Sequence, residues 1–109
     1  MKGRVLIIDN DREHADVLST KLTGFGYEVR TELSSHSAVE TADLFSPTAI
    51  VADPFADEFD PFGLLRELRL QQPHTPIILT ARNTSIEIAL RAIQEEGADH
   101  YFEKPVDAE

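Results

Sequence analysis

Cysteine is absent from this chain of 109 residues, and so is any long hydrophobic run. Without cysteine the protein can form neither a disulfide framework nor a thiolate metal site, which is consistent with a reducing compartment. The first apolar run covers only residues 5–8 and is too short for a signal-peptide core or a membrane span. We therefore expect a cytoplasmic protein that does not enter a membrane.

Basic residues are also scarce, because 10 Lys and Arg stand against 20 Asp and Glu and give a formal net charge of −10. An acidic surface repels phosphate backbones, so we expect no direct binding of nucleic acid by this domain, and any DNA contact falls to another domain. Most of these charges are expected to keep the protein soluble. The acids that follow the apolar runs need a separate explanation.

Strand-like and helix-like segments alternate along the whole chain. Continuous apolar runs suit strands buried on both faces, and apolar residues at helical spacing suit amphipathic helices. Strands are expected at residues 3–9, 27–31, 48–53, 76–80 and 100–103, and helices at 12–23, 35–46, 60–72 and 85–96. This order predicts one α/β domain: a single doubly wound five-stranded parallel sheet with helices on both faces.

Two details of the helices are open to test. Ser35 or Ser37 can cap the second expected helix. In the helix expected at 85–96, Ile88 and Ala92 lie off the main apolar stripe, and they either extend the core or join the last strand in a partner surface. That stripe is formed by Ile86, Ala89, Leu90 and Ile93.

The last residues, 106–109, look like the start of a fifth helix, which is therefore absent or truncated in this sequence. Without that helix, one face of the sheet lacks part of its cover. We expect residues 1–109 to be a domain-sized fragment of a longer chain, or another chain to cover the gap.

Polar side chains follow four of the expected strands at the point where each strand ends. Because the carboxyl ends of parallel strands meet at one edge of a sheet, these groups are expected to lie close together. Two carboxylates, an amide, a hydroxyl and an ammonium group at one edge suit a phosphate and a divalent cation. The residues are Asp9, Asn10, Asp53, Thr80 and Lys104, with Asp11 directly after Asn10.

Residues 5–11, 49–53, 76–81 and 97–105, in this order and spacing, resemble the receiver domain of two-component response regulators. The resemblance covers nearly all of the chain. It implies a flavodoxin-like fold with strand order 2-1-3-4-5 and a phosphoryl transfer from a sensor histidine kinase to an aspartate. It also implies that the protein is not an enzyme beyond its own phosphorylation and dephosphorylation.

The resemblance makes Asp53 the phosphoacceptor. Two acids and a phosphate within a few ångströms repel one another by several kcal/mol, so the site needs a cation. Mg²⁺ suits it, because this ion takes hard oxygen ligands and bridges carboxylate to phosphate. By resemblance the metal ligands are Asp9, Asn10, Asp53 and the backbone carbonyl of Phe55.

Three further residues match the phosphate-binding and switch positions of the family. Thr80 matches the hydroxyl that moves toward the phosphoryl group, and Tyr101 matches the aromatic residue that turns inward with it. Lys104 matches the lysine that pairs with the phosphate, and its peptide bond to Pro105 is cis in the family. The surface of the helix at 85–96 and of the last strand is then expected to change.

The sequence departs from the family pattern at Asn10, where the family has an acid. An amide oxygen carries no charge, so metal affinity should fall unless Asp11 compensates, and Asn10 reads equally well as an Asx turn that closes the strand. Phe55 and Arg82 stand at the positions that control access of water to the phosphoryl group, which predicts a long-lived phosphoryl state. Pro54 stiffens the loop directly after the phosphoacceptor.

Asn10 and Pro54 favour an alternative, a pseudo-receiver that binds partners without control by phosphorylation. A small phosphohydrolase is a weaker alternative, because Phe55 stands where a second acid is needed. Residues 86–93 with 102–105 resemble receivers of enhancer-binding transcription regulators, which implies a C-terminal output domain or partner chain and leaves a homodimer open. The four histidines, His14, His36, His74 and His100, lack metal-ligand spacing and are expected at the surface.

Overall fold

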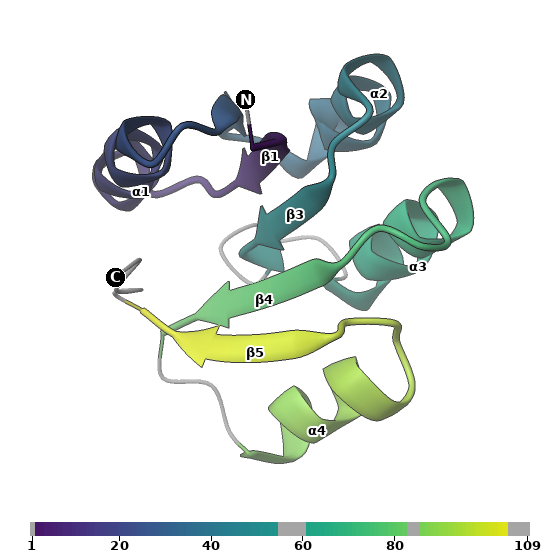
Figure 1. Cartoon of the computed structure of the whole chain (residues 1–109). Coiled ribbons are helices and arrows are strands. Elements are labelled where there is room, and N and C mark those ends of the chain that lie inside the picture. The colour runs from purple at the N-terminus through teal and green to yellow at the C-terminus, as the bar shows by residue number, and fades with distance from the viewer. Residues whose placement is uncertain (1, 55–60, 83–85, 105–109) are drawn as a thin grey trace.

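A five-stranded parallel sheet in the order β2-β1-β3-β4-β5 organises the molecule (Figure 1). The structure is a computed structural model that describes residues 2–54, 61–82 and 86–104. The predicted fold class and strand order are therefore confirmed. The elements are β1 (Arg4–Ile8), α1 (Arg12–Gly24), β2 (Glu28–Glu32), α2 (Ser35–Phe45), β3 (Ala49–Ala52), α3 (Pro61–Gln71), β4 (Ile77–Ala81), α4 (Ile86–Gln94) and β5 (His100–Glu103).

Alternate residues of the central strands belong to two apolar clusters, one on each face of the sheet. Leu6 and Ile8 of β1 pack with α2, α3 and the buried Ala92 of α4. Val5 and Ile7 of the same strand pack with α1 on the other face. Successive strand residues point to opposite faces, so helices lie on both faces, as predicted, and α1 lies apart from α2 and α3 (Figure 1).

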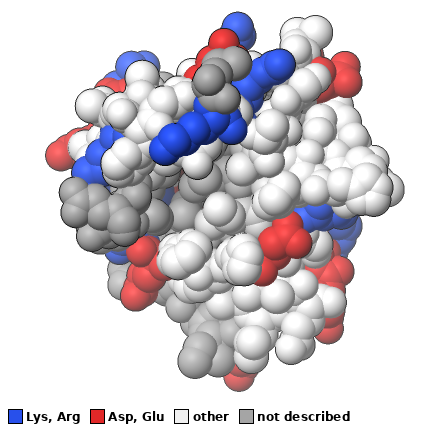
Figure 2. Space-filling view, in the orientation of Figure 1, with Lys and Arg blue, Asp and Glu red and all other residues white. Residues whose placement is uncertain are grey.

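The part of the α1 face formed by β4 and β5 carries little charge. Among the described residues, α1 supplies the buried helical side chains of this face, and Phe102 of β5 remains 50% exposed. In the orientation of Figure 1, uncharged side chains cover most of the surface over β4, β5 and α4 (Figure 2).

None of the described helices has the length and apolar character needed to span a bilayer.

The start of α2 corrects one prediction. Ser34, rather than Ser35 or Ser37, is the N-cap, and its side chain accepts a hydrogen bond from the backbone N–H of His36. An N-cap residue keeps an extended backbone, and Ser34 has φ −134° and ψ 139°. The hydroxyl of Ser37 instead donates to Glu32 at 2.6 Å.

The helix α4 forms where it was predicted, but it turns a different side toward the sheet. Ala92 is fully buried, whereas Leu90 and Ile93 of the predicted stripe are 48% and 39% exposed and Ile88 is 41% exposed. The end of α4 is fixed from α3, because Arg66 donates two hydrogen bonds to the buried Glu96. This anchor sets the rotation of α4, and the small Ala92 permits close approach to the sheet.

A second arginine of α3 ties the turn between α4 and β5 to the start of β4. Arg69 donates to the carbonyls of Gly97 (2.6 and 3.0 Å) and Thr75 (2.8 Å) and to Asp99 (2.7 Å). Asp99 also accepts from the backbone N–H of Ile77 at 2.8 Å. Gly97 has φ +91°, and a Cβ there would lie 3.2 Å from the Arg69 side chain, so the turn requires glycine.

The hydrogen bonds of Asp99 with Arg69 and the backbone N–H of Ile77 predict a loss of stability in acid. Burial alone would raise the pKa of Asp99, but the Ile77 N–H and the Arg69 guanidinium outweigh it and lower that pKa below 3.8. A depressed pKa contributes stability above the ordinary value, and this is lost as the pH falls through the lower folded value. In urea unfolding between about pH 5 and about pH 3, Asp99→Asn should lose less free energy of unfolding than wild type. Asp43→Asn, at an exposed aspartate of α2, should keep the wild-type slope; equal slopes for all three proteins would contradict this.

Candidate functional site

Three charged side chains from separate strands meet at the carboxyl edge of the sheet. Asp9 follows β1, Asp53 follows β3 and Lys104 follows β5. The Lys104 Nζ atom lies 2.8 Å from Asp9 Oδ1 and 2.5 Å from Asp53 Oδ2. Because β4 lies between β3 and β5, the lysine side chain reaches past the end of β4 to the two acids. The structure thus brings together three of the residues named from the strand ends, Asp9, Asp53 and Lys104.

The backbone of each charged residue is held by the neighbouring strand, which fixes where its side chain begins. These hydrogen bonds prolong the parallel ladder by one residue past the strand end, so the sheet itself sets the geometry of the cluster. The backbone pairs are Asp9 N to Glu32 O (2.9 Å), Asp53 N to Ile8 O (2.7 Å) and Lys104 N to Ala81 O (2.9 Å).

The cluster is almost closed to solvent, since Asp9, Asp53, Thr80 and Lys104 are all buried. Burial on its own would lower the pKa of Lys104, but its hydrogen bonds to Asp53 and then Asp9 outweigh this and raise the pKa above 10.5. The lysine is therefore an ammonium ion that compensates two carboxylates. Removal of one partner from such a buried group is expensive, because it leaves an uncompensated charge.

The turn between β1 and α1 holds Asp9 from its other side. Asp9 Oδ1 accepts from the backbone N–H of Asp11 at 2.9 Å, and Asp9 Oδ2 lies 2.8 Å from His14 Nδ1. Asp11 in turn caps α1 by accepting from the backbone N–H of His14. Both oxygens of Asp9 are thus engaged by groups of this chain.

The prediction that all four histidines lie at the surface is wrong for His14, which is buried. A lone histidine without metal spacing gave no reason to expect a role. The signal that could have found it is its place on the buried stripe of α1 beside Ala15 and Leu18, three residues after the capping Asp11. A polar residue on such a stripe needs a hydrogen-bond partner, and Asp9 is that partner.

Asp11 and Arg82, two further residues named from the sequence, lie at the margin of the cluster. Arg82 Nη2 lies 3.0 Å from Asp11 Oδ2, so an ion pair joins the β1–α1 turn to the segment after β4. The Arg82 guanidinium lowers the pKa of Asp11, with help from the backbone N–H of His14. Asn10 is exposed next to this pair. The ion pair bridges the outer side of the site.

The two switch candidates differ in their surroundings. The Thr80 hydroxyl lies 3.4 Å from the carbonyl oxygen of Ala52, the residue before Asp53, which is a long distance for a hydrogen bond. Tyr101 is half-buried and packs against the larger apolar cluster. Two other predicted site residues, Phe55 and Pro105, lie outside the described residues, as does the Lys104–Pro105 bond.

The donor atoms of the cluster fit Mg²⁺ in kind. Asp9 and Asp53 offer hard carboxylate oxygens and Asn10 offers an amide oxygen, and magnesium completes its octahedron with water. In the described residues no group of three or more His, Cys, Asp or Glu side chains could hold a metal. The site therefore offers two charged ligands with Lys104 between them.

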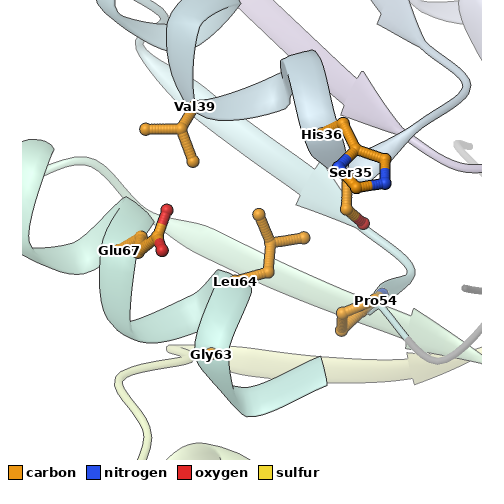
Figure 3. Close-up of a pocket in the computed structure, with 7 residues that line it drawn as sticks. All are labelled: Ser35, His36, Val39, Pro54, Gly63, Leu64 and Glu67. Atoms are coloured by element: carbon orange, nitrogen blue, oxygen red, sulfur yellow. The ribbon is translucent and has the colours of Figure 1, made fainter. Parts of the chain in front are cut away.

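A cavity of about 340 Å³ adjoins the site between α2 and α3 (Figure 3). Pro54, the residue after Asp53, forms one end with Ser35 and His36, while Val39 and Glu67 lie at the other (Figure 3).

Comparisons with known proteins agree with this fold. A family model described as response regulator receiver domain matches residues 5–109. The transcriptional regulatory protein ZraR of Salmonella typhimurium is 30% identical over 103 residues, which cover 94% of this chain and 23% of that protein. Among solved structures, NtrX from Brucella abortus has a TM-score of 0.89 and 28% identity, with 99% of this chain and 24% of that chain covered. The chemotaxis protein CheY4 of Vibrio cholerae has a TM-score of 0.88 and 25% identity, with 98% and 90% covered.

Proposed function

Since the chain belongs to the family of response regulator receiver domains, we propose that it is a phosphoacceptor switch of two-component signalling in the cytoplasm. Asp53 accepts a phosphoryl group from the phosphohistidine of a sensor kinase. The observation that carries this proposal is the contact of Lys104 with both Asp9 and Asp53 at the carboxyl edge of the sheet. This contact places a carboxylate nucleophile, a second acid and the ammonium group of Lys104 side by side.

The transfer forms a bond from an Asp53 oxygen to phosphorus while the bond from phosphorus to the histidine nitrogen of the kinase breaks. Asp9, Asn10, Asp53 and the carbonyl of Phe55 would hold a magnesium ion, which would supply charge neutralisation for this transfer. Lys104 lies against Asp53 Oδ2 and can follow the negative charge onto the phosphoryl oxygens as a point charge. The domain itself does no more than position these groups.

The switch follows from the same contacts. The Thr80 hydroxyl has a weak bond to Ala52 and is therefore available to donate to a phosphoryl oxygen on the adjacent Asp53. Tyr101 lies opposite Leu79 in the β4–β5 register, so a shift of the Thr80 segment is passed to β5 and α4. The exposed apolar residues of α4 are the surface that this change alters.

The chain spans about a quarter of the length of ZraR and NtrX. We therefore propose that residues 1–109 act as the receiver of a longer protein, with a C-terminal output domain or a partner chain that responds to the α4–β5 surface. A homodimer through this surface is the alternative arrangement. The net charge of −10 argues that nucleic acid is contacted elsewhere.

The competing proposal is a pseudo-receiver that binds partners in one state. Two features favour it: the neutral Asn10 at a ligand position, and Pro54 directly after Asp53. Both lower the expected rate of phosphorylation without removing the nucleophile. The two proposals differ in whether Asp53 reacts at all.

Incubation with acetyl phosphate distinguishes them. With Mg²⁺ present, we expect intact-mass spectrometry to show one added phosphoryl group, and we expect none when the cation is removed with EDTA. The added mass should be lost in alkali, because an acyl phosphate hydrolyses readily. A protein that stays unmodified over a wide range of Mg²⁺ concentrations would reject the switch in favour of the pseudo-receiver.

A further inference from the structure

A buried histidine contacts Asp9, one of the two carboxylates of the proposed cation site. His14 lies in the first turn of α1, and its Nδ1 atom is 2.8 Å from Asp9 Oδ2. Both side chains are almost fully buried. Because an ionised carboxylate can only accept hydrogen bonds, the Nδ1 atom must carry a proton and donate it.

The two oxygens of Asp9 have different surroundings. Oδ1 faces the centre of the site, where it accepts from Lys104 Nζ and from the backbone N–H of Asp11. Oδ2 faces α1 and is held by His14. The imidazole therefore fixes the rotation of the carboxylate without occupying the side that faces Asp53.

We propose that His14 is a positioning residue for the divalent cation, and that it acts by presenting Asp9 Oδ1 to the metal. The inference rests on the proposed function, since it concerns the cation which that function needs. Outer hydrogen bonds to a ligating carboxylate commonly change metal affinity by about 10-fold to 100-fold.

The contact of His14 with Asp9 matters more because residue 10 is an asparagine. With Asn10 in place of an acid, Asp9 is the one ionised ligand candidate that the β1–α1 turn directs toward Asp53 and Lys104. A rotation of Asp9 about its side chain would turn Oδ1 away from Lys104. His14 thus keeps the Asp9 carboxylate oriented at a site that has one acidic ligand fewer.

Titration calorimetry of Mg²⁺ into the full chain tests the proposal without any phosphoryl donor. We expect His14→Leu to weaken Mg²⁺ binding by about 10-fold or more. His14→Asn should bind close to wild type, because its amide nitrogen can take the place of Nδ1 and donate to Asp9. The matched control, His74→Leu at an exposed histidine between α3 and β4, should not change the affinity.

Equal or tighter binding by His14→Leu would overturn the inference while leaving the proposed function intact. A wild-type protein that binds no Mg²⁺ would instead overturn both. If His14→Leu does not fold, NMR of the wild-type imidazole decides the question. A Nδ1 proton that stays protected from exchange when Mg²⁺ saturates the site supports the positioning role, and loss of that proton on Mg²⁺ binding rejects it.

Discussion

Asp53→Asn should abolish phosphoryl uptake from acetyl phosphate and from a kinase. The amide has nearly the shape of the carboxylate and its oxygen can still accept from Lys104, which lies 2.5 Å from Asp53 Oδ2. It lacks the negative oxygen that attacks phosphorus, so the nucleophile is removed while the packing is kept. The measurement is intact-mass spectrometry after incubation with acetyl phosphate and Mg²⁺.

Two matched variants separate the loss of the nucleophile from the loss of an acid in general. Asp99→Asn removes a carboxylate at the opposite end of β5, and Asp11→Asn removes one at the margin of the site. We expect both to accept a phosphoryl group. An Asp53→Asn protein that still gains mass would place the acceptor on another residue, and Asp9 would be the first to test.

The strand ends made the cluster of Asp9, Asp53 and Lys104 predictable from the sequence. Each residue stands at or directly after the end of an expected strand, and the carboxyl ends of parallel strands share one edge whatever the order of the strands. The order itself, with β2 at the edge next to β1, came from the family resemblance. Alternating strands and helices are compatible with more than one order.

Features that depend on packing between elements were not predictable in the same way. Helical spacing could have placed His14 on the buried stripe of α1, but its hydrogen-bond partner becomes clear only when Asp9 is known to face α1. The rotation of α4 depends on the pairing of Arg66 with Glu96, which are 30 residues apart. Helical spacing indicates which residues are apolar, but the neighbour of a helix decides which of them are buried.

Lys104→Met is expected to lower the free energy of unfolding by about 3 kcal/mol at neutral pH in the absence of divalent cations. The ammonium group of Lys104 is the charge that compensates the buried Asp9 and Asp53 in the described part of the chain. Methionine keeps the length and the apolar stem but leaves the two carboxylates to repel each other. Urea unfolding measures the change, and Lys21→Met, at an exposed lysine of α1, should differ little from wild type.

Magnesium should restore part of this loss, because a ligand that binds only the folded protein stabilises it by mass action. The raised pKa of Lys104 also predicts that the wild-type protein loses stability when this lysine loses its proton. The stability that it contributes is present below the ordinary pKa and is lost as the pH rises through the higher folded value, so wild type should approach the variant only in strong alkali.

An unchanged free energy of unfolding in Lys104→Met would mean that the two acids share a proton when the lysine is gone. The variant would then take up about one proton more than wild type near neutral pH on folding, which a pH titration of stability detects as a new slope.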